Sequence, residues 1–95
     1  MRIRDVDSLD PAQSWWVAAV RAPQRDWAGA PGCRRGARFL IDEASCRPAR
    51  DGFACFESRS DCLRWILAHR PELVRNAPDS AVVPVELAHW LLGLE

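Results

Sequence analysis

The residues of this chain best suited to chemistry are four cysteines and one histidine near them. They are Cys33, Cys46, Cys55, Cys62 and His69. Together they offer enough sulfur and nitrogen ligands for a tetrahedral zinc site. Structural zinc sites usually bring cysteines in close pairs, however, whereas the gaps here are twelve, eight, six and six residues. The spacing therefore predicts neither a metal site nor a cofactor.

A reactive cysteine is the second chemical hypothesis. Cys62 is expected near a helix start, where backbone amides and the helix dipole lower the pKa of a thiol. His69 lies on the same face, but two turns, about 10 Å of rise, separate it from Cys62 and prevent a direct hydrogen bond. Cysteine is also among the most buried residue types, so Cys55 and Cys62 are interpreted as core residues and His69 as a core-edge residue. The sequence contains no common catalytic motif, and we expect no enzyme.

Arginine is distributed unevenly along a chain whose net charge is zero. Residues 21–50 carry seven Arg and three acidic residues, whereas residues 51–95 carry four Arg and seven acidic residues. Arginine binds carboxylates and phosphates through paired hydrogen bonds, and Trp and Arg are enriched at binding hot spots. The predicted partner-binding surface comprises Trp27, Arg34, Arg35, Arg38, Arg47 and Arg50. Most of it comes from the Gly- and Pro-rich stretch 23–36 and its flank.

Two kinds of partner suit such a surface. The favoured one is a protein or nucleoprotein complex with an acidic surface, because nucleic-acid binders are typically basic overall and this chain has a pI near 6.7. Direct nucleic-acid binding by an arginine-rich sheet edge is the alternative. A further interpretation is that these arginines are solvated surface residues that bind no partner. The sequence does not determine the oligomeric state.

Three strands are predicted upstream of two helices. Alternating apolar residues and the Asp51-Gly52 turn indicate strands at 37–43 and 53–57, joined by a longer loop. Residues 15–21 contain aromatic and β-branched residues without a 3.6-residue stripe, which favours a third strand. Ser58 and Asp61 match a capping box at the start of a helix over 59–69, which Pro71 should end.

These elements predict an α+β fold in a single domain over residues 1–95. A second helix is expected over 84–94, with Pro84 in its first turn. The three-stranded antiparallel sheet would carry both helices on one face. If residues 11–21 are helical instead, the fold becomes a hairpin with three helices.

The composition indicates the type of genome that encodes the protein and the compartment in which we expect it. Thirteen Arg and no Lys, with no Tyr and no Thr, are typical of a G+C-rich genome, bacterial or that of a phage infecting such a host. The N-terminus lacks the apolar run of a secretory signal, and no stretch is long and apolar enough to cross a bilayer. We therefore expect a cytoplasmic protein without a membrane partner, whose cysteines stay reduced.

In size and composition the chain resembles the small accessory proteins of phages and mobile elements, which include inhibitors of bacterial defence such as anti-CRISPR proteins. This resemblance is one of class, and no functional residue is carried over from it. It implies a small non-catalytic binding protein that occupies a surface on a protein or nucleoprotein target. A zinc or reactive-thiol protein is the third hypothesis.

Overall fold

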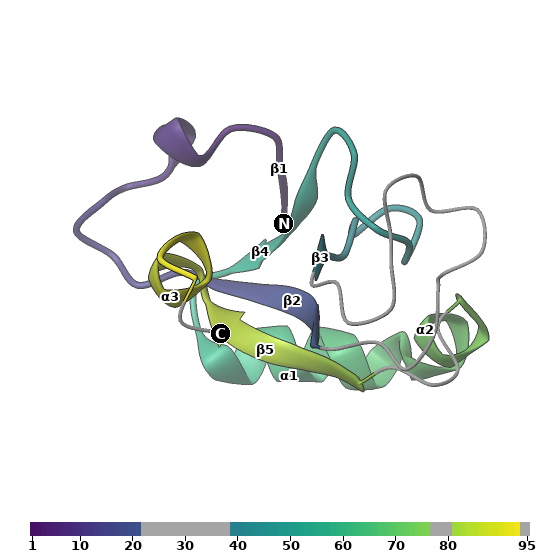
Figure 1. Ribbon diagram of the computed structural model, residues 1–95. Helices are drawn as coiled ribbons and strands as arrows, with labels where there is room; N and C mark the ends of the chain where they lie inside the picture. Colours follow the sequence, from purple (N-terminus) through teal and green to yellow (C-terminus); the bar gives the residue numbers. More distant parts are fainter. Residues whose placement is uncertain (22–38, 77–80, 94–95) are drawn as a thin grey trace.

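The protein is described here by a computed structural model that covers residues 1–21, 39–76 and 81–93. Its sheet is built around the six-residue strand β2 (Trp16–Arg21). Along its whole length β2 pairs with β5 (Ala81–Glu86), from which fifty-nine residues of chain separate it. Figure 1 shows these two strands side by side through the middle of the molecule.

Three shorter strands complete the sheet on the other side of β2. Strand β4 (Phe53–Phe56) pairs with the first residues of β2, and β3 (Phe39–Leu40) pairs with residues near its end. Strand β1 (Arg2–Ile3) then pairs with β4. All of these pairings are antiparallel, so the predicted α+β class is confirmed, whereas the predicted number of three strands was too low.

The strands at 39–40 and 53–56 do not form the hairpin that their order in the sequence suggests. Both pair with β2, one after the other along the same edge. They are linked to each other where the Ala54 amide donates a hydrogen bond of 2.9 Å to the Ile41 carbonyl. Within the long loop between them, Ile41 and Pro48 form an isolated antiparallel bridge.

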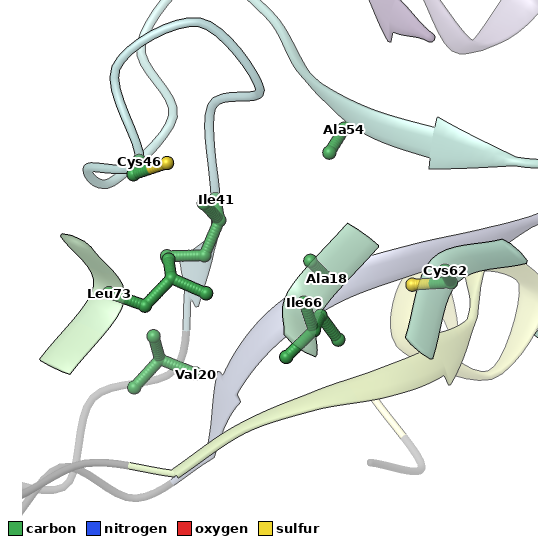
Figure 2. Close-up of a cluster of buried hydrophobic side chains, with 8 residues drawn as sticks. All are labelled: Ala18, Val20, Ile41, Cys46, Ala54, Cys62, Ile66 and Leu73. Atoms are coloured by element: carbon green, nitrogen blue, oxygen red, sulfur yellow. The ribbon is translucent and has the colours of Figure 1, made fainter. Parts of the chain in front are cut away.

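One face of the sheet packs against the longest helix, α1 (Arg59–Ala68), and against α2 (Arg70–Asn76). Figure 1 shows α1 running beneath β2 and β5. Figure 2 shows the buried side chains that fill this layer. They are Ala18, Val20, Ile41, Cys46, Ala54, Cys62, Ile66 and Leu73.

The opposite face has its own core under the N-terminal segment and α3 (Leu87–Leu91). A one-turn 3-10 helix, η1 (Val6–Ser8), lies within that segment. The buried residues of this second layer are Ile3, Val17, Ala19, Cys55, Val85 and Leu87. Strand β2 therefore sends alternate side chains into two cores, as the period of a strand requires.

The start of α1 has the serine half of the predicted capping box, whereas the Asp61 carboxylate contacts Arg64. The Ser58 hydroxyl accepts a hydrogen bond of 3.1 Å from the Asp61 amide and so satisfies one of the free donors of the first turn. Cys62 is buried as predicted and Ile66 is buried with it, whereas the neighbouring Leu67 is 55% exposed, so the helix packs on the sheet through a narrow face. The helix ends before Pro71 as expected, although α2 begins at once and holds this proline in its first turn.

The prediction of a helix over 84–94 was wrong at its start, over residues 84–86. Residues 81–86 form β5, and the helix that follows has only five residues. Leu87 at its start belongs to the core opposite α1, so the two predicted helices lie on different faces of the sheet rather than on one.

Pro84 is tolerated inside β5 for a geometric reason. It lies opposite Ala18, whose carbonyl accepts a hydrogen bond from the Ile41 amide on the far side of β2. The Ala18–Pro84 pair is therefore a non-hydrogen-bonded pair of the antiparallel ladder. The nitrogen of Pro84 points to the outer edge of β5, where its missing hydrogen removes no bond to β2.

Candidate functional site

Two of the six predicted partner-binding residues, Arg47 and Arg50, lie within the described part of the chain, and both are exposed. They belong to the loop that connects β3 to β4. Trp27, Arg34, Arg35 and Arg38 lie outside the described residues. The described part of the predicted surface is thus this loop, which we call the arginine loop (residues 42–52).

Backbone hydrogen bonds fold the arginine loop tightly. The Asp42 amide donates to the Arg47 carbonyl at 2.8 Å, and the Ala49 amide donates to the Leu40 carbonyl at 2.9 Å. At the turn, Cys46 adopts a left-handed conformation with φ of 55° and is buried. Its carbonyl accepts a hydrogen bond of 2.7 Å from the Asn76 side chain at the end of α2. These contacts fix the backbone from which both arginines project.

Two acidic side chains of the arginine loop form ion pairs, whereas its two arginines form none within the described residues. Arg2 binds the Asp42 carboxylate at 3.1 Å, and the amino group of Met1 binds the Glu43 carboxylate at 2.9 Å. Within the described ranges, neither Arg47 nor Arg50 forms an ion pair. The loop therefore presents cationic side chains to solvent, although the exposed carboxylate of Asp51 follows directly.

The three described cysteines are buried free thiols. Burial raises the pKa of Cys62 to about 12. Burial, followed by a hydrogen bond to Glu72, raises that of Cys46 to about 11. The pKa of Cys55 is also raised, chiefly by burial. At Cys62 the loss of water thus outweighs the opposing charges of Arg59 and the N-terminal amine, and the thiol stays protonated at neutral pH.

His69 plays a packing role at the end of α1. Its ring stacks on Trp65, with the ring centroids 4.6 Å apart. Its Nδ1 lies 2.9 Å from the Trp65 carbonyl, and because a carbonyl oxygen only accepts, Nδ1 carries the hydrogen. The predicted core-edge position is confirmed by its partial burial. Among the described residues, no three His, Cys, Asp or Glu side chains gather in a way that would hold a metal ion.

Two open grooves were not predicted from the sequence. One, of about 470 Å³, lies beside α1 and is lined by Met1, Phe56, Trp65 and His69 among others. The other, of about 450 Å³, lies between the N-terminal segment and α3 and carries the carboxylates of Asp7, Asp10 and Glu86. The run of three acids and no base over residues 5–15 was a signal for the second groove, but its far wall comes from the other end of the chain.

No protein family, curated protein or solved structure matched the chain in comparisons with known proteins. No helix within the described ranges is long and apolar enough to span a membrane. Any function proposed for the chain therefore rests on its own residues.

Proposed function

We propose that this protein is a non-catalytic cytoplasmic binding protein that occupies an acidic surface on a protein or nucleoprotein complex. The proposed contact surface is the arginine loop together with Trp27, Arg34, Arg35 and Arg38. Its target class follows from the resemblance to small accessory proteins of phages and mobile elements. A host defence complex is therefore the first kind of target to test.

The observation that carries this proposal is the pair of exposed, unpaired arginines on a fixed loop. Arginine loses side-chain entropy when it binds, and a backbone that is already ordered adds little further cost. The hydrogen bonds at Asp42, Cys46 and Ala49 supply that order. A guanidinium held in this way can bind a carboxylate through two parallel hydrogen bonds.

Direct nucleic-acid binding is the competing function, because the same side chains bind phosphate. It predicts an affinity that falls steeply with salt, as each phosphate contact releases counterions. A reactive-thiol function is less well supported, since the raised pKa values of Cys46 and Cys62 leave almost no thiolate at neutral pH.

The test is affinity capture from lysate of a G+C-rich bacterium, with and without nuclease, followed by mass spectrometry. Three baits are compared: the wild-type chain, Arg47→Glu/Arg50→Glu, and Arg59→Glu, which reverses an exposed arginine on α1. We expect the same partner with the wild-type and Arg59→Glu baits after nuclease. The double variant should bind the purified partner at least about tenfold more weakly, at unchanged melting temperature.

A partner captured equally by all three baits would remove the arginine loop from the proposal. Charge reversal at Arg34 and Arg35 tests the remaining part of the surface in the same way. Material that disappears with nuclease, together with a steep salt dependence, would identify nucleic acid as the ligand instead.

A further inference from the structure

The groove between the N-terminal segment and α3, which we call the acidic groove, is lined by apolar side chains, here termed its floor, and by carboxylates, here termed its rim. The floor is contributed by both ends of the described chain: Val6, Leu9, Trp15, Leu87 and Leu91. Leu91 is 59% exposed, and the neighbouring Leu92 is 72% exposed. Leu91 therefore extends the apolar lining of the groove into solvent.

The walls of the acidic groove are tied together by hydrogen bonds. The Trp15 indole donates a bond of 3.0 Å to the Asp10 carbonyl, and the Asp10 carboxylate accepts one of 2.9 Å from the Ala12 amide. The Leu87 amide donates a bond of 2.8 Å to the Trp15 carbonyl and so joins α3 to the N-terminal segment. The groove is thus formed before any ligand binds, which lowers the entropic cost of binding.

The rim of the groove carries charge of one sign. Asp7, Asp10 and Glu86 line it, and no Arg of the described ranges does. Asp7 has no ion-pair partner in the described part of the chain, and Glu86 lies 3.8 Å from His89, which is cationic only when protonated. An apolar floor with an anionic rim matches a segment that carries apolar and cationic side chains together.

We infer that the acidic groove binds a cationic amphipathic segment of a protein partner. An aliphatic side chain of that segment lies on the floor beside Leu91, and Arg or Lys side chains reach Asp7 and Glu86. This surface is independent of the proposed arginine loop. Nucleic acid and anionic lipid are repelled by the rim. A second copy related by a two-fold axis would bring the same carboxylates face to face.

The test uses a blocked synthetic peptide of about 14 residues, built of Arg, Leu and Ala with the leucines at helical spacing. A second peptide has the same composition in an order that creates no apolar face. Each is titrated into the full chain by isothermal calorimetry and by NMR. The groove variants are Leu91→Ser and Asp7→Asn/Glu86→Gln. Their matched controls are Leu67→Ser, at a leucine of 55% exposure on α1, and Asp51→Asn in the arginine loop.

We expect the amphipathic peptide to bind and to shift NMR signals of residues 6–15 and 86–91. Leu91→Ser and the double variant should each weaken binding at least about tenfold, while both controls keep the wild-type affinity. The inference is overturned if the peptide does not bind, if the scrambled peptide binds equally well, or if groove and control variants lose affinity alike. It is also overturned if sedimentation shows that the chain self-associates through Leu91, because a second copy then occupies the groove.

Discussion

At the scale of single residues, the alternation of side chains was the most predictable feature. A strand over residues 15–21 places successive side chains on opposite faces, and Trp15 and Trp16 do pack against opposite cores. Cys55 and Cys62 were expected to be buried, and both are. The raised pKa values of these thiols follow from burial rather than from position in the sequence. Burial depends on the neighbours that tertiary packing brings to each thiol.

Gly52 illustrates a residue whose role depends on such a neighbour. A Cβ atom at this position would lie 2.9 Å from the Ile3 carbonyl oxygen and 3.0 Å from Nε of Arg2. We expect Gly52→Ala to push β1 away from β4 and to lower the free energy of unfolding by about 1–2 kcal/mol. Urea denaturation followed by tryptophan fluorescence measures the change. Ser45→Ala, at an exposed position in the same loop, should have almost no effect; equal stability of Gly52→Ala and the wild type would contradict the prediction.

At the scale of elements, the strands and helices that a local sequence pattern specifies were predicted. A strand that depends on pairing with a distant strand was missed. Strand β2 contains aromatic and β-branched residues, β4 follows the Asp51-Gly52 turn, and helix α1 begins with the Ser58 cap. Strand β5 contains Pro84 and is followed by a run of apolar residues, which locally resembles a helix start. Its extended form depends on pairing with β2, a contact that no local pattern reveals.

Pro84 also protects the outer edge of β5. Among the described strands β2 is the sole partner of β5, and the amide that would point outward at its centre is absent. We expect Pro84→Val to restore this donor and to increase self-association through the open edge. Sedimentation velocity over a range of concentrations measures the effect, with Pro71→Ala in α2 as a control outside the sheet. The same concentration dependence in both variants would show that the proline has no such role.

At the scale of the whole molecule, the predicted class held while the arrangement of layers did not. A sheet with one helical face was expected, and the structure has a core on each face. The acidic groove escaped prediction for the same reason. Asp7 and Glu86 line one groove only because the N-terminal segment leads into β2, which pairs with β5 so that Trp16 lies opposite Glu86.

The stability of the whole molecule should fall at alkaline pH, and the composition makes this simple to test. The chain has no Lys and no Tyr, so thiols are the side chains expected to titrate between about pH 9 and pH 12. Burial raises the pKa of Cys62 from 9.0 to about 12. The folded chain therefore keeps a proton that the unfolded chain loses, and stability falls as pH rises between these values.

We expect the free energy of unfolding to fall by on the order of 2 kcal/mol for Cys62 alone by about pH 11. Urea denaturation at a series of pH values measures this slope, and thiolate absorbance in the ultraviolet reports the titration itself. Cys62→Ala should flatten the slope, even if its stability at neutral pH is lower. An equally steep slope in that variant would assign the effect to other groups.

The pairing of β2 with β5 also has a consequence during protein synthesis. Fifty-nine residues separate the end of β2 from the start of β5. At the usual pace of ribosomes, translating that stretch takes roughly 3 to 12 seconds. Throughout this interval one edge of the apolar strand β2 has no native partner. The nascent chain is then most vulnerable to misassembly, and a chaperone that shields β2 would act in this window.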